Sequence, residues 1–212
     1  MNHLRRTLRA AEATSLRLRA HVREGFTLIE TLAAITLLIV AIVSPMLLTE
    51  RSLASAYYAR DQITAYYLAQ EAIEAIRQIR DDNILKIAHY TGPLTSSPNL
   101  FDGINSVSPS CNGPQQYFTV DATQTNINPT PCPTPSDPTS CPNLQTSGGL
   151  YGYGANWSNT YFKRVAYACY TDSSQDEVFL SVTVSWQTGA LAARSFTMTE
   201  DLYRWVQDGS GS

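Results

Sequence analysis

The chain has 212 residues, enough for one globular domain with added elements, and its hydrophobic share of 43% is ordinary for a folded protein. Its formal charge of -3 is unevenly spread, because residues 1–25 hold six arginines against two glutamates, a net +4, which leaves -7 for the rest. An acidic body makes nucleic acid an unlikely partner. A short basic head is typical of a signal that keeps the N-terminus on the cytoplasmic side of a membrane.

A run of nineteen residues without a charge or a histidine, from Thr31 to Thr49, follows the basic head. A helix needs about 20 apolar residues to cross a bilayer core, so the run predicts a single membrane span with the C-terminus outside. The alternative is a buried core helix of a soluble protein, which the basic head and the N-terminal position disfavour. Pro45 is expected to bend or locally unwind this helix without ending it.

One carboxylate, Glu30, stands at the start of the span. At depth in lipid it costs about 2.5–3.5 kcal/mol unless it is paired or functional. No Lys or Arg occurs between Arg23 and Arg51, so the chain offers no obvious partner. Cleavage between Gly25 and Phe26 would create an amine one helical turn before Glu30, and this amine could neutralise a carboxylate of the same or a neighbouring helix. Otherwise Glu30 is a snorkelling residue at the membrane edge.

The stretch GFTLIE, from Gly25 to Glu30, resembles the class III signal of type IV pilins and pseudopilins, since a basic leader precedes it and an apolar helix follows. The resemblance covers about residues 23–50. It implies that a prepilin peptidase removes residues 1–25 and methylates the new terminal Phe26, and that Glu30 sets the register between subunits of a fibre. The implied partners are this peptidase, other pilin or pseudopilin subunits, the inner-membrane assembly platform and membrane lipid.

Two other export signals compete with this interpretation. An ordinary secretory signal could be cut after Ala54-Ser55-Ala56, which would release a soluble domain. Arg5-Arg6 could belong to a twin-arginine signal, but the apolar run begins some twenty residues later, so we discount it.

The helix should continue past the span, to about Ile87, because no Gly or Pro occurs from Glu50 to Asn83. Steps of three and four residues mark one apolar face, made of Ala65, Leu68, Ala72, Ile76 and Ile79. On the exposed side, Arg77 is spaced to pair with Glu74 and with Asp81. Four tyrosines could face a lipid interface or a fibre, or could pack on the domain, namely Tyr57, Tyr58, Tyr66 and Tyr67.

Residues 91–150 are rich in Pro, Ser, Thr, Asn and Gly, and ten of the eleven prolines lie between Pro93 and Pro142. This composition predicts loops, with QYFTV (residues 116–120) as the one candidate strand. An irregular connection pinned by disulfides is favoured over a surface that meets a partner.

All four cysteines lie in the predicted exported part, and an even count there predicts two disulfides with three possible connectivities. Cys132 and Cys141 bracket the proline-stiffened segment CPTPSDPTSC, which favours that pair and leaves Cys111 with Cys169. A metal site is the weaker alternative, because there is no C-x-x-C pair and His89 is the one histidine of the exported part.

Residues 151–212 predict an antiparallel sheet. EVFLSVTVSWQ alternates strictly between apolar and polar side chains, and YFKRVAYACY and LAARSFTMTE read as its neighbours in a meander. The expected fold is therefore α+β, with a long N-terminal helix packed on the sheet. The expected divisions are a leader at 1–25, a membrane or fibre-core helix at 26–48, an amphipathic helix at 49–90, loops at 91–150 and the sheet at 151–212. This order resembles minor pilins of the V type and minor pseudopilins of the I type.

Catalytic and cofactor motifs are missing from the sequence, so we expect no enzyme and no cofactor. Asp172, Asp176 and Glu177 could hold calcium, as the resemblance to pseudopilins suggests, but their irregular spacing favours a solvated turn. Asn156-Trp157-Ser158 is a weak glycosylation sequon. We expect a minor pilin or pseudopilin, at the bacterial inner membrane and then in an extracytoplasmic fibre. The alternative is a membrane-anchored or secreted binding domain that forms no fibre.

Overall fold

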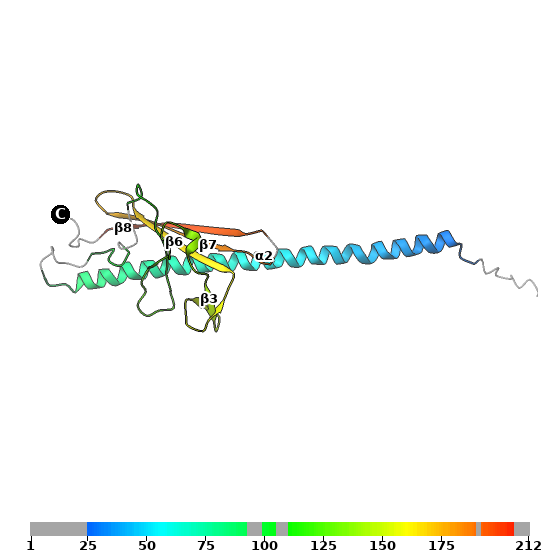
Figure 1. The fold of residues 1–212 in the computed structure, drawn as a ribbon, viewed down its shortest axis with the longest axis horizontal. Helices are drawn as coiled ribbons and strands as arrows, with labels where there is room; N and C mark the ends of the chain where they lie inside the picture. The colour runs from blue at the N-terminus through cyan, green and yellow to red at the C-terminus, as the bar shows by residue number, and fades with distance from the viewer. Residues whose placement is uncertain (1–24, 93–98, 105–109, 190–191, 206–212) are drawn as a thin grey trace, which may run out of the picture. The chain divides into compact units, whose positions relative to one another are not determined.

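The computed structural model describes residues 25–92, 99–104, 110–189 and 192–205, so the predicted basic leader up to Glu24, Arg5 and Arg6 included, lies outside the described residues. The chain divides into two compact units, Met1–Leu53 and Ala54–Ser212, which we describe separately. The elements of Figure 1, in chain order, are α2 (Leu28–Ala88), β1 (Tyr117–Thr119), β2 (Thr130–Pro131), the 3-10 helix η3 (Pro138–Ser140), β3 (Gln145–Ser147), β4 (Leu150–Gly152), β5 (Ser158–Asn159), β6 (Phe162–Tyr170), β7 (Glu177–Trp186) and β8 (Arg194–Tyr203).

The predicted long helix is confirmed as the 61 residues of α2, which ends one residue after the expected Ile87. The residues on both sides of Pro45 are α-helical, so the helix does not end there, and the kink expected at this proline stays a prediction. The first buried residue of α2 is Asp61, about one turn after Tyr57 and well after the expected start of the amphipathic part at residue 49.

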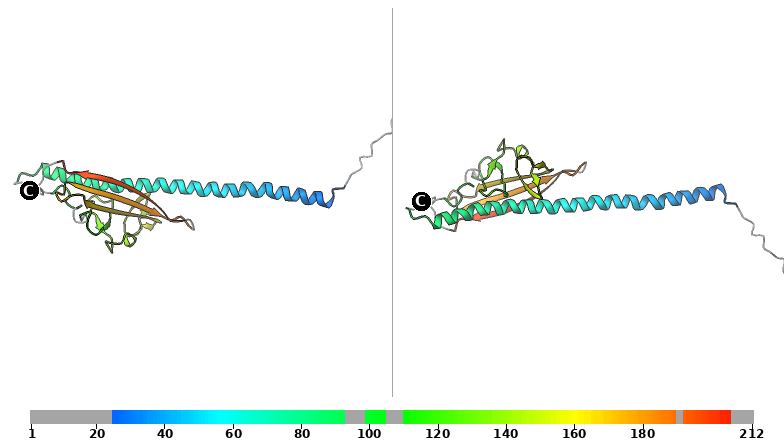
Figure 2. Two further views of the ribbon diagram at one scale, coloured as in Figure 1. Left: turned by 90° about the horizontal axis from the view of Figure 1, so that it is seen from above. Right: turned by 90° about the horizontal axis from the view of Figure 1, so that it is seen from below.

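The main sheet has five strands in the order β2-β1-β6-β7-β8, and every neighbouring pair in it is antiparallel. The predicted meander of three long strands is confirmed as β6, β7 and β8. In β7 the expected inner side chains are at most 5% exposed, namely Val178, Leu180, Val182, Val184 and Trp186. Both views of Figure 2 show this sheet lying along the later part of α2.

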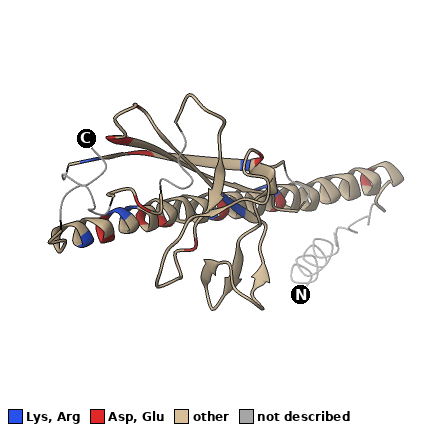
Figure 3. Cartoon of the chain, turned by 60° about the vertical axis from the view of Figure 1, so that its left-hand side comes forward, with Lys and Arg blue, Asp and Glu red and all other residues tan. Residues whose placement is uncertain are grey.

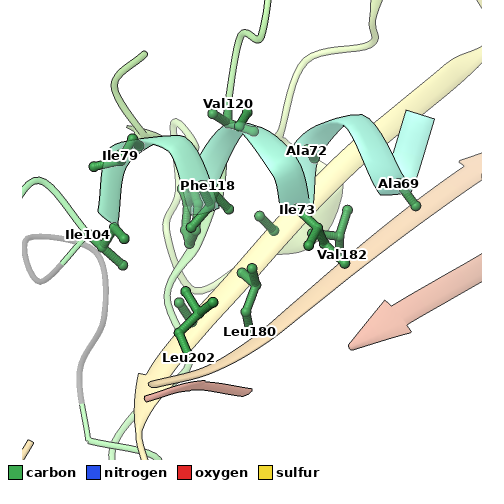
Figure 4. Close-up of a cluster of buried hydrophobic side chains, with 14 of the residues drawn as sticks. Ala69, Ala72, Ile73, Ile79, Ile104, Phe118, Val120, Leu180, Val182 and Leu202 are labelled. Atoms are coloured by element: carbon green, nitrogen blue, oxygen red, sulfur yellow. The ribbon is translucent and has the colours of Figure 1, made fainter. Parts of the chain in front are cut away.

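The core lies between the inner face of this sheet and one face of α2. All five residues predicted for the apolar helical face are buried. In Figure 4, side chains from α2 such as Ile73 meet Val182 and Leu180 of β7, while Phe118 and Val120 close the core from the β1 side. Removing this apolar surface from water, at about 25 cal/mol per Å², is the main term that holds helix and sheet together.

A second, three-stranded sheet in the order β4-β3-β5 contradicts the prediction of a single strand between residues 91 and 150. Its strands have two or three residues, too few to show alternation in a sequence. Gly148 and Gly149, with φ of +59° and +86°, join Ser147 to Leu150 in a two-residue hairpin. Two positive φ values in succession favour glycine, so the Gly-Gly pair was a usable hairpin signal.

Charge pairing on α2 is partly as expected. Arg77 contacts Glu74 at 2.9 Å, but the predicted pair with Asp81 is wrong. Arg77 instead reaches Glu200 of β8 at 2.5 Å, and Asp81 contacts Arg80 at 2.9 Å. Arg77 pairs with Glu200 because the side chain of Glu200 is less exposed to water than that of Asp81, and an ion pair is stronger where water is partly excluded.

The structure contains the two disulfides in the favoured connectivity. Cys111–Cys169 ties the chain before β1 to the end of β6, beside a backbone bond from Cys111 N to Tyr170 O of 3.0 Å. Cys132–Cys141 closes a short loop that contains η3, whose first turn is capped by Asp137 accepting from Thr139 N at 2.8 Å.

A buried guanidinium joins three elements that are distant in sequence. Arg164 of β6 is 1% exposed and donates to Leu68 O (3.1 Å) and Glu71 Oε2 (2.7 Å) of α2, and to Val120 O after β1 (2.7 Å). A buried cation is tolerated only with such partners.

A buried carboxylate makes a second polar link of this kind. Asp61 of α2 accepts from Tyr161 Oη at 3.0 Å and from Thr188 Oγ1 at 2.5 Å. It therefore connects the helix with the segments at the ends of β6 and β7. Neither Asp61 nor Arg164 was expected to be buried.

Replacing Arg164 with Met should lower the free energy of unfolding by about 2–4 kcal/mol, because two backbone carbonyls and Glu71 lose their shared donor. The measurement is urea unfolding of the full chain in detergent, followed by tryptophan fluorescence. Arg60→Met, at an exposed site on α2, is the control and should change the free energy of unfolding by no more than about 0.5 kcal/mol. Equal effects of the two changes would contradict this role of Arg164.

The two disulfides should differ in their contribution to stability. Their sequence separations are 58 and 9 residues, and a longer closed loop removes more entropy from the unfolded chain. On that basis Cys111→Ser/Cys169→Ser should cost about 4 kcal/mol and Cys132→Ser/Cys141→Ser about 2.5 kcal/mol. The same unfolding assay compares the two double variants, and a larger loss for the short loop would contradict the argument.

Candidate functional site

The candidate site begins with three residues that precede α2. Gly25, Phe26 and Thr27 have no regular secondary structure and are exposed, with 78% exposure at Phe26. A Cβ added to Gly25 would meet no atom within 4 Å, and its φ is outside the left-handed region. The described part of the fold therefore gives no packing reason for a glycine at this position.

Thr27 caps the first turn of α2. Its carbonyl oxygen accepts from Glu30 N at 3.0 Å and from Thr31 N at 3.1 Å, and its Oγ1 accepts from Glu30 N at 3.3 Å. Thr27 and Glu30 have the Thr-x-x-Glu spacing of a capping box, a signal that the sequence analysis missed. The cap at Thr27 explains why the helix starts at Leu28, two residues after Phe26.

Glu30 is exposed in the first turn of the helix. Within the described residues Glu30 makes no ion pair, and the first residue of α2 that does is Glu71. A negative charge in a first turn interacts favourably with the helix dipole, but this interaction is worth only about 0.3–1 kcal/mol. The carboxylate is thus free to pair with a cation that the described chain does not supply.

The helix that follows carries no charged side chain from Thr31 to Thr49, and Glu50 and Arg51 are the next charged residues. Its most apolar 18-residue window has a mean hydropathy of 2.5, and none of it is buried. The exposed large apolar side chains of this segment are Phe26, Leu28, Ile29, Leu32, Ile35, Leu37, Leu38, Ile39, Val40, Ile42, Val43, Met46, Leu47, Leu48 and Leu53. By its length and composition, the helix is long and apolar enough to span a membrane.

The few polar groups of this segment are satisfied by the helix itself. The hydroxyls of Thr31, Thr36, Ser44 and Thr49 donate to carbonyl oxygens three or four residues earlier, at 2.8–2.9 Å. A hydroxyl bonded in this way offers no unpaired donor to a hydrocarbon environment. The Ser44 bond to Val40 O lies beside Pro45, which has no N–H of its own to donate.

The four helix tyrosines divide into two kinds. Tyr58 lies under the Arg194 guanidinium, 5.4 Å from the ring centre, and Tyr66 meets Phe196 edge-on at 5.7 Å between ring centres. These two pack on β8, as the plainer interpretation expects. Tyr57 and Tyr67 are 49% and 63% exposed and so remain available to an environment outside the chain.

The acidic turn between β6 and β7 has internal partners for its charge. Arg204 Nε lies 3.1 Å from Asp176 Oδ1, and the Ser174 hydroxyl bonds to Asp172, which lowers the pKa of that carboxyl. Within the described residues, no group of three or more His, Cys, Asp or Glu is placed to hold a metal ion. These contacts are those of a solvated turn.

The two other polar positions singled out in the sequence are exposed. His89 shares a 2.8 Å hydrogen bond between Nδ1 and Leu85 O at the end of α2. Asn156 has a φ of +67°, a conformation that asparagine tolerates in turns. Neither residue joins the candidate site.

Comparisons with protein-family models, with curated proteins and with solved structures find no match to this chain.

An arginine in the middle of the apolar segment should impair membrane insertion. Val40→Arg should shift the insertion equilibrium by about 3 kcal/mol, or more than a hundredfold, because a central cation must be taken into hydrocarbon. The measurement is the fraction of newly made chain that resists alkaline extraction from membrane vesicles. Ile63→Arg, at a residue 57% exposed but outside the segment, is the control and should insert like the wild type.

Proposed function

We propose that this chain is a minor structural subunit of a type IV pilus or of a type II secretion pseudopilus. In this proposal a prepilin peptidase cuts the precursor between Gly25 and Phe26, and the mature chain assembles through the apolar helix that begins at Leu28. The observation that carries it is the combination of an exposed, non-helical Gly25–Phe26 bond with a capped helix whose apolar side chains are uncovered.

Processing fits the local chemistry. The bond after Gly25 is exposed and a side chain is absent there, so a peptidase at the membrane surface can approach the backbone closely. By contrast, Ala54-Ser55-Ala56, the rival cleavage point, is α-helical, and its peptide bonds would have to leave the helix before cleavage. Methylation of the new Phe26 amine would follow in the same enzyme.

Glu30 is the proposed assembly residue. After cleavage the Phe26 amine is cationic and lies one helical turn from the carboxylate, and in a fibre the amine of a neighbouring subunit can take the same place. Pairing in an apolar surrounding is strongly favoured over two isolated charges. The carboxylate would then fix the register of one subunit against the next.

The part of the chain from Ala54 onward would be displayed outside the inner membrane. Two disulfides in this part agree with an oxidising compartment. The partners in the proposal are the peptidase, other pilin or pseudopilin subunits, the inner-membrane assembly platform and lipid. We propose no enzymatic activity and no nucleic-acid partner for it.

The first test is the intact mass and the N-terminal peptide of the mature protein from its native membrane. The expected mature chain begins at Phe26 and carries one methyl group on its amine. Gly25→Val should block cleavage, although a side chain there meets nothing in the fold, while Thr36→Val should be processed normally as the control. A terminus at Tyr57 would indicate a secreted soluble domain, and an uncut Met1 a simple membrane anchor.

A matched pair of variants in the same host separates assembly from anchoring. Glu30→Gln should be inserted and processed but largely lost from sheared fibres, because an uncharged amide cannot neutralise a cationic amine. Thr31→Val, its neighbour, should still enter the fibres. Normal incorporation of Glu30→Gln would favour the alternative, a membrane-anchored binding domain that forms no fibre.

A further inference from the structure

Two adjoining hollows lie beside the small β4-β3-β5 sheet, in a part of the chain that the proposed function does not use. One has a volume of about 490 Å³ and the other about 380 Å³, and both are lined by Pro142 and Tyr153. Together they form a groove, here called the amide groove, between the small sheet and residues 119–130. Each hollow is within the size range of about 300–1,000 Å³ that is usual for small-molecule sites.

The lining of the amide groove is unusual in its chemistry. No lysine, arginine or aliphatic side chain lines it, and Asp121 is its one carboxylate. Figure 3 shows the small sheet without any charged residue. Half of the twelve lining residues carry side-chain amides, namely Gln124, Asn126, Asn128, Asn143, Gln145 and Asn159.

Part of this lining is held in place by internal hydrogen bonds. Gln145 Oε1 accepts from Gly154 N at 3.1 Å, and its Nε2 donates to Asn159 Oδ1 at 3.2 Å. Asp121 Oδ2 accepts from Tyr153 N at 3.2 Å, which connects the two hollows. The Cys132–Cys141 disulfide restrains the chain immediately before Pro142. A preformed lining lowers the entropy lost when a ligand binds.

Asp121 is already saturated with donors. Besides Tyr153 N, it accepts from Thr123 N at 3.0 Å, from Thr123 Oγ1 at 2.7 Å and from Gln124 Nε2 at 3.2 Å. Partial burial raises the pKa of this carboxyl, but the hydrogen bonds outweigh that effect and lower the pKa below its ordinary value. The carboxylate therefore supports the groove and has little capacity left for a cation.

Three other amides are available to a ligand. Asn126, Asn128 and Asn143 are exposed, and their side chains make no hydrogen bond to the parts of the chain that the structure describes. An amide offers two donors and an acceptor at a fixed spacing, and a hydroxyl offers a donor and an acceptor. Amides on both sides of a groove thus match a ligand that carries many hydroxyls.

Aromatic rings provide the apolar contact that such a ligand also needs. Tyr153 is half-buried and lines both hollows. The half-buried Trp157 indole lies directly against Gly154, where an added Cβ would be 2.4 Å from the indole Nε1. A rigid ring gives a large contact area at a low entropy cost, which suits the C–H face of a sugar.

The chemistry of the groove decides between classes of ligand. Nucleic acids and phosphates need cations, which the lining lacks. Peptide docking uses apolar pockets for side chains, and this lining offers only Pro142 and Tyr153 to form them, since its other side chains are polar. We propose that the amide groove binds a neutral carbohydrate through Asn126, Asn128 and Asn143. This holds whether or not the chain assembles into a fibre.

The test is binding of the full chain to an array of neutral oligosaccharides, followed by calorimetry on each hit. The chain is kept in a zwitterionic detergent, because maltoside and glucoside detergents carry sugar headgroups that would compete. At least one neutral oligosaccharide should bind. Asn128→Ala/Asn143→Ala should weaken it by roughly tenfold or more, as expected for the loss of two hydrogen bonds.

The matched control is Gln78→Ala/Asn112→Ala, which removes two exposed amides far from the groove lining. It should leave affinity within roughly twofold of the wild type, about 0.4 kcal/mol. Circular dichroism checks that both double variants keep the fold. The proposal is overturned if no neutral saccharide on the array binds, if binding is unchanged in Asn128→Ala/Asn143→Ala, or if the groove takes a peptide or polyanion in place of a saccharide.

Discussion

Burial of one face of α2, from Ala65 to Ile79, against the inner face of β7 is the interaction on which the unit from Ala54 onward depends. The helix contributes small and medium apolar side chains at steps of three and four, and the strand contributes one at every second position. The helix repeats its buried face every 3.6 residues and the strand every 2 residues, and the two buried faces pack against each other. β6 and β8 extend that surface, and β1 reaches it from the other side.

This constraint also explains the few buried polar groups. A helix laid across a sheet leaves carbonyl groups of both elements near the core, and buried polar groups must be paired. Arg164 donates to Leu68 O on the helix and to Val120 O after β1. Asp61 accepts hydrogen bonds from hydroxyl groups in two loops. These links position the middle of α2 relative to β6 and to the segments that flank β6 and β7, in a way that apolar contact, which has no direction, does not.

The segment before Leu53 obeys the opposite constraint. Its large apolar side chains are exposed, and none of its most apolar 18-residue window is buried. Its hydroxyls are bonded to its own backbone, so the helix is self-sufficient in hydrogen bonds and depends on its surroundings for apolar contact. Lipid and other apolar helices are two environments that can cover such a surface.

The sequence by itself determined the features that depend on local pattern. The extent of α2, its buried face, the alternation of β7 and the β6-β7-β8 meander all follow from periodicity over ten or more residues. The short loop between Cys132 and Cys141 likewise favoured the observed pairing. The roles that the GFTLIE stretch suggests for Gly25, Phe26 and Glu30 stay predictions, and the cap at Thr27 became evident only in the structure.

Only the tertiary structure decided the remainder, because it depends on which distant residues meet. The strands of the small sheet are too short to carry a period, and their register comes from neighbours elsewhere in the chain. Arg77 forms its ion pair with Glu200 and not with Asp81, because a partner on a distant strand outweighs the spacing along one helix. Arg164 is a core residue for a similar reason, since its ion pair is with Glu71, which is distant in sequence. The amide groove has the same origin: its side chains come from segments between residues 119 and 159 that no local pattern places together.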